Sequence, residues 1–323
     1  MRDSFGRRIN YLRISVTDRC NLRCRYCMPE EGVAAVAHEE ILRFGEIERL
    51  VRIFVRLGVN RLRLTGGEPL VRRDLPALAA SLKAIPGVDF LGITTNGILL
   101  PQFAQRLCDA GVDGVNISLD TTDPHRYAHL TRRDEWAQAQ AGIQAALALP
   151  FSAVKINCVF SPDSLPADWL GVAALARSLP VEVRFIEWMP MLGDGRAAVR
   201  AQEALAAIEA HCGVCTPLGR RAGEGPASYY QIAGFAGSVG VIPAMSRHFC
   251  ADCNRIRLTA TGDLKLCLFY GAGVSLRSLL RSGAGDEAIA EAIQNAVAEK
   301  PERHRGEVVH GGCAACGMSQ IGG

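Results

Sequence analysis

Residues 20–27 read Cys-Asn-Leu-Arg-Cys-Arg-Tyr-Cys, and this stretch decides the fold class. Cys20, Cys24 and Cys27 stand at the spacing C-x3-C-x2-C, with Tyr26 directly before the last thiol. Thiolates are soft ligands, and closely spaced groups of them select zinc, copper(I) or an iron–sulfur cluster. A structural zinc site needs four ligands, whereas this local set stops at three. Three cysteines on a cubane cluster leave one iron without a protein ligand, where a substrate or cosubstrate can bind.

The same stretch with its flanks, from Asp18 to Pro29, resembles the radical S-adenosylmethionine (SAM) superfamily. The resemblance implies that the open iron binds the amino and carboxylate groups of SAM. It also implies that the reduced cluster cleaves SAM into methionine and a 5′-deoxyadenosyl radical. A structural zinc knuckle or unrelated buried thiols are the alternatives, and the downstream sequence Gly-Gly-Glu-Pro at 66–69 favours the radical-SAM interpretation over both.

The bulk composition is that of an ordinary globular protein, with 49% hydrophobic and 21% charged residues in 323. The net charge of +3 gives no indication of nucleic-acid binding. There is no apolar run of 18 or more residues, so no membrane span is expected, and the start does not resemble a signal peptide. We therefore expect a cytoplasmic protein, in which grouped thiols indicate metal binding or catalysis instead of disulfides.

Some of the 12 cysteines lie outside the two main groups. Cys108 and Cys158 are single and are expected to be small buried hydrophobes. The pairs Cys212/Cys215 and Cys313/Cys316 stay unassigned: incidental thiols are one interpretation of the first pair, and zinc or free thiols remain open for the second.

Short apolar strands alternate with helical segments through the N-terminal half. Alternation of this kind predicts a parallel sheet with helices outside it, and about six units are too few to close an eight-stranded barrel. We expect an α/β protein with an open, partial (β/α)6 barrel at 1–190, the shape that the superfamily resemblance also implies. Strands are expected at 11–15, 61–64, 90–94, 114–118, 155–160 and 181–186, and helices at 41–57, 75–85, 101–110, 136–147 and 165–179.

Polar side chains follow several of these strands, where functional residues of such sheets lie. The glycines at 66 and 67 let the backbone approach a ligand, and Glu68 adds a carboxylate. The third and fourth strands end in hydroxyl, amide and carboxyl groups, which also serve in turns and helix caps. These residues are Thr94, Thr95, Asn96, Asn116, Ser118 and Asp120.

Residues 191–323 form the expected C-terminal extension, which would bind a cluster and the substrate and close the barrel. A loop is expected at 190–195, a helix at 200–211 and a flexible stretch at 219–225. Cys250 and Cys253 form a C-x2-C pair, and a hairpin of 255–259 with 263–268 would return Cys267 to their side. Three thiols again predict a cluster with an open iron, while a zinc site completed by His248 or another cysteine is the alternative.

Taken together, the motifs resemble the MoaA family of GTP 3′,8-cyclases, which begin molybdenum cofactor synthesis. The resemblance rests on the sequences at 5–7, 11–21 and 65–69, on both cysteine sets and on the terminal Ile-Gly-Gly. It implies two [4Fe-4S] clusters, SAM, and the conversion of GTP to 3′,8-cyclo-7,8-dihydroguanosine 5′-triphosphate. A radical-SAM peptide-modifying enzyme with an auxiliary cluster, or a non-catalytic iron–sulfur or zinc protein, are the alternatives.

Site residues are carried over only where this chain matches the family. The resemblance implies GTP contacts at Arg13, Arg63, Thr94, Lys155, Arg255 and Arg257. It implies SAM contacts at Tyr26, Gly67, Ser118 and Met189, and catalytic roles for Arg255, Arg257, Gly322 and Gly323. A triphosphate needs several cations, and arginine forks bind phosphate oxygens in pairs. An electron donor such as a flavodoxin or ferredoxin, a downstream cyclic pyranopterin monophosphate synthase and a homodimer are the expected partners.

Overall fold

The computed structural model describes residues 1–304, apart from 191–195, 197, 220–224, 248 and 272. Its described residues form one twelve-stranded sheet in the order β12-β11-β10-β1-β2-β3-β4-β5-β6-β9-β8-β7. The six expected parallel strands lie together in sequence order at its centre. They are β1 (Tyr11–Ser15), β2 (Arg61–Thr65), β3 (Phe90–Thr95), β4 (Gly114–Ser118), β5 (Ala153–Phe160) and β6 (Glu182–Glu187).

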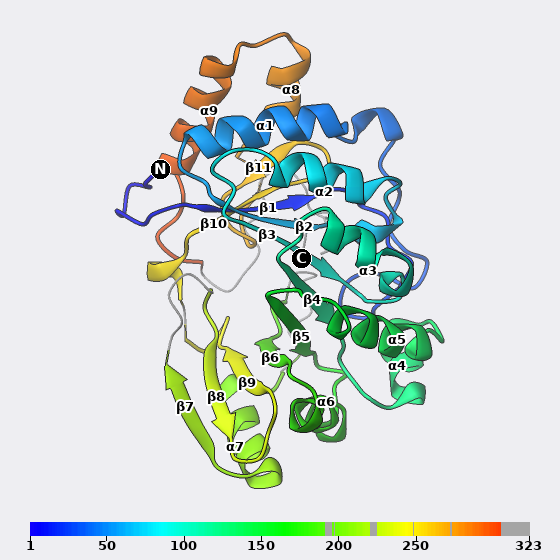
Figure 1. Cartoon of the computed structure of the whole chain (residues 1–323). Coiled ribbons are helices and arrows are strands. Elements are labelled where there is room, and N and C mark those ends of the chain that lie inside the picture. The colour runs from blue at the N-terminus through cyan, green and yellow to red at the C-terminus, as the bar shows by residue number, and fades with distance from the viewer. Residues whose placement is uncertain (191–195, 197, 220–224, 248, 272, 305–323) are drawn as a thin grey trace.

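The expected helices are confirmed and lie outside the curved sheet (Figure 1). They are α1 (Phe44–Arg56), α2 (Leu75–Lys83), α3 (Leu100–Asp109), α5 (Trp136–Leu147), α6 (Pro166–Ser178) and α7 (Ala201–Cys212). The first of them begins at Phe44 and not at residue 41, because the Glu46 carboxylate accepts the backbone N–H of Arg43 at 2.7 Å and caps the helix there.

An α/β fold is therefore confirmed, and the sheet shows no pairing between its two ends within the described residues. Two strands of the C-terminal extension join the sheet in parallel with its central strands. β10 (Arg255–Leu258) pairs in parallel with β1, and β9 (Ser238–Ile242) pairs in parallel with β6. Residues from 238 onward thus lengthen the parallel row at both of its edges.

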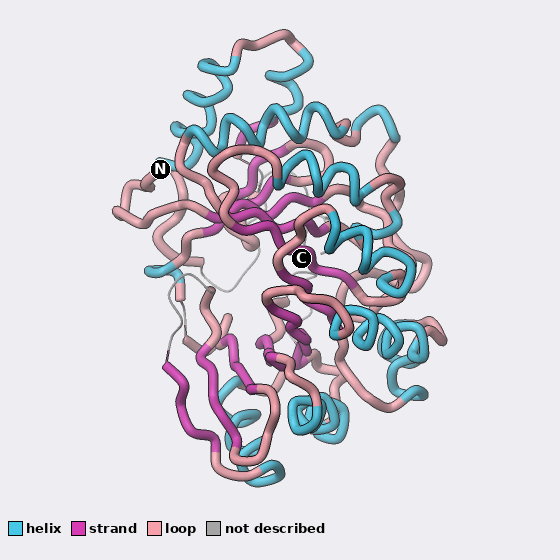
Figure 2. Tube along the Cα trace, in the orientation of Figure 1, coloured by secondary structure: helices cyan, strands magenta, loops and turns pink. Residues whose placement is uncertain are grey.

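Antiparallel strands complete each edge of the sheet. β11 (Asp263–Lys265) pairs antiparallel with β10, which confirms the expected hairpin. β12 (Val274–Ser275), which the sequence interpretation missed, pairs with β11. β8 (Ser228–Ile232) and β7 (Cys215–Gly219) follow β9 and form the lower-left lobe of Figure 2. The sequence interpretation had missed β7, β8 and β9, and most of the stretch expected to be flexible, 220–224, lies outside the described residues.

Three further helices were also missed. α4 (Pro124–Thr131) lies between β4 and α5, while α8 (Leu276–Arg281) and α9 (Asp286–Ala298) lie beside α1 (Figure 1). Short 3-10 turns cover His38–Glu40 before α1, Pro69–Val71 between β2 and α2, and Cys250–Asp252 before β10.

Helices and sheet meet in a continuous apolar core. The rings of Phe160 and Phe185 stack with centroids 5.3 Å apart, and Trp169 meets Phe160 edge to face at 5.5 Å. Cys158 is buried in this core as expected, whereas Cys108 is only half-buried. The core fills the outer side of the sheet, so the polar residues of the strands are left to face the inner side.

Candidate active site

A cavity of about 580 Å³ lies on the inner side of the sheet. Both three-cysteine sets line it, although more than 200 residues separate them in the sequence. Every site residue expected from the sequence that belongs to the described part of the chain also lines it. Those residues are Arg13, Tyr26, Arg63, Gly67, Thr94, Ser118, Lys155, Met189, Arg255 and Arg257.

The first cysteine loop follows β1 and folds into a compact turn. The backbone N–H groups of Cys27 and Met28 donate to the Cys24 carbonyl at 2.9 and 3.2 Å. Burial raises the pKa of the Cys20 thiol to about 11 and also raises the pKa of Cys24 and Cys27. Binding to iron compensates for the cost of keeping buried thiolates charged, so this three-thiol donor set suits a cluster.

The glycine turn after β2 packs against this loop. A Cβ on Gly66 would lie 2.6 Å from the Thr17 carbonyl oxygen, and one on Gly67 would lie 2.5 Å from the Arg19 carbonyl oxygen. Both glycines line the cavity, and their lack of a side chain also lets the backbone of residues 17–19 pack against them. Their close approach to a ligand stays a prediction.

Glu68 has a supporting role in the same turn. Its buried carboxylate accepts hydrogen bonds from Leu70 N–H at 3.0 Å, Thr95 Oγ1 at 2.7 Å and Asn96 N–H at 2.7 Å. Burial raises the pKa of Glu68 to about 7, although these three donors oppose the rise. The carboxylate thus ties the ends of β2 and β3 together beside the first cysteine loop.

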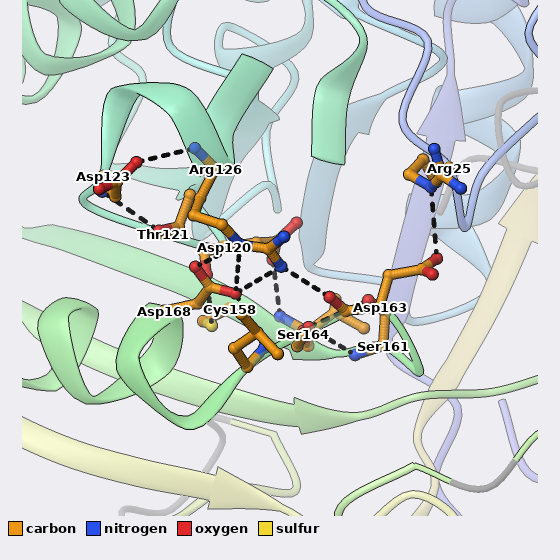
Figure 3. A network of polar contacts seen from close by, with 12 residues as sticks. Arg25, Asp120, Thr121, Asp123, Arg126, Cys158, Ser161, Asp163, Ser164 and Asp168 are labelled. Atoms are coloured by element: carbon orange, nitrogen blue, oxygen red, sulfur yellow. Dashed lines mark hydrogen bonds and ion pairs between the residues drawn. The ribbon is translucent and has the colours of Figure 1, made fainter. Parts of the chain in front are cut away.

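Asp120, beyond the end of β4, connects the cysteine loop to the next strands. It accepts the backbone N–H of Val159 at 2.8 Å and the phenol of Tyr26. Burial raises the pKa of Asp120 to about 6. Ser118 precedes it at the cavity wall. Figure 3 shows Asp120 within a larger polar network that joins Arg25 of the loop to α4 and α6.

The second cysteine set is completed by the β10–β11 hairpin, as expected. Cations surround it: Arg7 donates to the Cys250 carbonyl at 2.8 Å, and the buried Lys300 donates to the carbonyl of Leu266 beside Cys267. Burial alone would raise the pKa of Cys253, but the charges of Arg255 and Lys300 lower it to about 7. Three thiols in this cationic setting also suit a cluster.

The zinc alternative for this set stays a prediction, because its suggested fourth ligand, His248, lies outside the described residues.

Basic side chains form rows across three adjacent strands between the two sets. The strand register places Arg63 of β2, Arg13 of β1 and Arg257 of β10 opposite one another. Two residues earlier on each strand, Tyr11 lies between Arg61 and Arg255. Residues two apart on a strand share a face, so both rows face the cavity that they line. Like charges side by side destabilise a sheet unless an anion binds to them.

One arginine of this group, Arg63, is held in a fixed position. Its Nε donates to the Tyr11 hydroxyl at 2.5 Å, and its Nη1 donates to the Ile93 carbonyl at 2.9 Å. Gly92, its cross-strand neighbour, leaves room for the guanidinium, because a Cβ there would lie 2.8 Å from it. Burial and the charge of Arg255 lower the pKa of Arg257 to about 10.

A second polar group lines the opposite wall of the cavity, on β5 and β6. Lys155 is buried and its ammonium lies 2.5 Å from the Glu182 carboxylate and 5.5 Å from the centroid of the Tyr229 ring. Arg184 donates to the amide oxygen of Asn157 at 2.6 Å through Nη2.

Asn157 and Arg184 line the cavity but were not expected from the sequence. Asn157 stands two residues after Lys155 on β5, and Arg184 stands two residues after Glu182 on β6. Because these polar side chains alternate with apolar ones along each strand, the sequence pattern could have identified them.

Some expectations fall outside the structure. Gly322, Gly323, Cys313 and Cys316 lie beyond the described residues. The Cys212/Cys215 pair lies at the end of α7 and the start of β7, and neither thiol lines the cavity. A search of the described helices found none that is both long and apolar enough to span a membrane.

Comparison with known proteins is consistent with this geometry. The Radical SAM superfamily model matches residues 14–176, and the Molybdenum Cofactor Synthesis C model matches residues 181–306. The chain is 49% identical to a GTP 3′,8-cyclase of Pelotomaculum thermopropionicum over 100% of both chains. It is 43% identical to molybdenum cofactor biosynthesis protein 1 of Bos taurus, over 94% of this chain and 48% of that protein.

A solved structure supports the fold. The crystal structure of Streptococcus suis SuiB bound to S-adenosylmethionine superposes with a TM-score of 0.57. It is 14% identical and covers 81% of this chain and 60% of its own. At that identity the likeness concerns the fold alone.

Proposed function

The chain belongs to the family of GTP 3′,8-cyclases, radical-SAM enzymes of molybdenum cofactor biosynthesis with two [4Fe-4S] clusters, and we propose how its residues divide the work of that reaction. Cys20, Cys24 and Cys27 hold the cluster that binds SAM. Cys250, Cys253 and Cys267 hold the cluster beside the GTP. When bound, the clusters and SAM would supply a 5′-deoxyadenosyl radical that takes a hydrogen atom from C3′ of GTP. The C3′ radical would then bond to C8 of guanine, and one electron from an external donor and one proton would complete the dihydroguanine product.

The observation that carries this proposal is the pair of basic rows between the two cysteine sets. Arg13, Arg63, Arg255 and Arg257 face one cavity, where a polyanion would offset their mutual repulsion. We assign the phosphates and guanine of GTP to this group together with Thr94 and to Lys155 on the opposite wall. Arg255 and Arg257 are the residues that we place nearest the reacting nucleotide.

SAM belongs at the other end of the cavity in this proposal. Tyr26, Gly67, Ser118 and Met189 line that end together with the first cysteine loop. The chain's own contribution to the chemistry is to position the two ligands and to shield the radical from water, since the cofactors carry the reaction itself.

We extend the proposal to the last two residues. Glycines without a Cβ can thread a narrow channel, and the family resemblance assigns Gly322 and Gly323 to the active site. Removal of both should leave iron content and SAM binding unchanged while severely lowering formation of the cyclised nucleotide. Wild-type turnover by the truncated chain would end this part of the proposal.

The proposal also includes partners and location. A flavodoxin or ferredoxin would supply electrons, and a cyclic pyranopterin monophosphate synthase would consume the product. A cytoplasmic site of action suits the ten described cysteines, all of which are free thiols. A homodimer is testable by light scattering of the reconstituted protein.

The test is an anaerobic incubation of reconstituted, reduced protein with SAM and GTP. Iron and sulfide of about eight each per chain, 5′-deoxyadenosine and a cyclised nucleotide are expected. Omitting GTP separates this function from a peptide-modifying enzyme, because a burst of SAM cleavage should depend on the nucleotide. Zinc without sulfide, or no cyclised product at full iron content, would contradict the proposed function.

A further inference from the structure

The helix α4, which the sequence interpretation missed, is built to end beside the first cysteine loop. The Asp123 carboxylate caps its start by accepting the N–H of Arg126 at 2.8 Å, and Pro124 occupies its first position. Its last residue is Thr131, and the C-cap residue that follows, Arg132, has a left-handed backbone with φ 55°. Glycine is the usual residue in that conformation, so an arginine there suggests that its side chain has a role.

The end of α4 and the cysteine loop satisfy each other's backbone groups. The last carbonyls of a helix have no donors within the helix. Here the Leu130 carbonyl accepts the N–H of Arg25, and the Thr131 carbonyl accepts the N–H of Arg23, at 3.0 Å each. In return, Nη1 of Arg132 donates to the carbonyls of Arg23 at 2.9 Å and Met28 at 3.1 Å. The bonded residues flank Cys24 on both sides and follow Cys27 directly, so this contact positions two of the three thiols.

α4 is itself fastened to the neighbouring helix, as Figure 3 shows. Arg126 donates to the Asp168 carboxylate of α6 at 2.9 Å and to the Asp163 carbonyl at 2.7 Å. Asp168 is buried and the Arg126 side chain is 25% exposed, so this ion pair is partly shielded from solvent. The Asp163 carboxylate also lies 3.6 Å from Arg25 of the loop. The cysteine loop is therefore anchored to a rigid pair of helices as well as to its own strand.

We propose that Arg132 is a positioning residue for the SAM-binding cluster. Its guanidinium bridges the residues before Cys24 and after Cys27 and keeps these thiols at the spacing that the cluster needs. The inference rests on the proposed assignment of Cys20, Cys24 and Cys27 as cluster ligands. Arg132 does not line the cavity, so it acts through the loop and not on a substrate.

The decisive variant is Arg132→Gly. Glycine adopts the left-handed backbone without strain, so this change removes the guanidinium and keeps the helix end. Arg133→Ala is the matched control, because Arg133 is the exposed neighbour and its side chain donates only to the Arg132 carbonyl among the bonds described. Arg132→Lys retains one donor group and should give an intermediate result.

Two measurements avoid dependence on turnover. In cluster-free protein, hydrogen exchange of the Arg23 and Arg25 amides should become about tenfold faster in Arg132→Gly, because lost anchoring favours local opening. After reconstitution, iron should fall from about eight toward about four per chain, while GTP binding to the second cluster is kept. The KM for SAM should rise about tenfold, in the range typical of lost supporting contacts at metal sites.

Arg133→Ala should match the wild type in all three measurements. Arg132→Gly protein that also matches the wild type in exchange, iron and KM for SAM would overturn the inference. The same holds if Arg132→Lys is no better than Arg132→Gly in a chain that melts at the wild-type temperature. A wild-type chain without iron would instead contradict the proposed function, so the two failures are distinguishable.

Discussion

The two cysteine sets line one cavity but differ in their electrostatic surroundings. The first lies beside the buried carboxyl groups of Glu68 and Asp120, and burial raises the pKa of all three of its thiols. The second lies among cations, which lower the pKa of Cys253 to about 7, although burial raises the pKa of Cys250 in the same set. A site with carboxyl groups suits a ligand with an ammonium and a sulfonium, and a site with cations suits a polyphosphate. In the proposed function, the same three-thiol motif would thus serve two ligands because its neighbours differ.

The largest effects are expected when one thiol is removed from each set, which tests whether the two sets differ in function. Cys24→Ser should lose about half the iron and all formation of 5′-deoxyadenosine, with or without GTP, because the cluster that binds SAM is lost. Cys267→Ser should keep SAM binding and the first cluster but lose GTP cyclisation. Cys108→Ser, which changes a thiol outside the cavity, is the control. Iron analysis and product assay measure the effects, and GTP cyclisation by Cys267→Ser would refute the contrast.

A smaller effect is expected at Lys155, on the wall opposite the arginine rows. Lys155→Met should raise the KM for GTP about 30- to 150-fold, corresponding to the roughly 2–3 kcal/mol of a charged hydrogen bond, and leave the KM for SAM unchanged. Lys83→Met is the matched control, because Lys83 also pairs with a carboxylate, at 2.8 Å from Asp113, but on the outer helix α2. Equal changes in both KM values would show that Lys155 supports the fold and not the nucleotide.

The smallest effect concerns Tyr11, whose phenol lies within the arginine rows. Burial alone would raise the pKa of Tyr11, but the charges of Arg63 and Arg13 lower it to about 8. A phenolate competes with phosphate for Arg63, so the KM for GTP should rise as the pH passes 8, by about tenfold at pH 9. Tyr11→Phe cannot ionise and should show a flatter profile. Tyr230→Phe, on β8, should behave like the wild type, and identical profiles for all three would contradict this role.

The direction of the Tyr11 pKa shift can also be tested by measuring the stability of the protein at different pH values. The pKa of Tyr11 is lower in the folded chain than its usual value of 10, so the stability from its ionisation is complete above pH 10. This contribution is lost as the pH falls through 8, and at pH 7 it is absent. Denaturant melts should therefore show that, relative to pH 7, the free energy of unfolding of the wild type rises between pH 8 and pH 10. Tyr11→Phe should lack this rise.

Local patterns in the sequence determined much of this protein. The alternation of apolar strands and amphipathic helices predicted β1 to β6 and their covering helices, because burial on one face leaves a periodic trace. Cysteine spacing predicted both three-thiol sets, since ligands that bind one cluster must lie close together in a loop. The family resemblance then located all the described site residues on what proved to be a single cavity.

Tertiary structure alone decided the contacts between distant segments. β10 pairs with β1, and this placed Arg257 opposite Arg13 across more than 240 residues of sequence. α4 has only eight residues, too short for a clear helical period, yet its Asp-Pro start was a readable signal. What the sequence could not show is that its end holds the cysteine loop, or that Gly66 and Gly67 serve that loop's backbone. Such contacts depend on side-chain and backbone surfaces meeting in space, and no spacing along the chain records them.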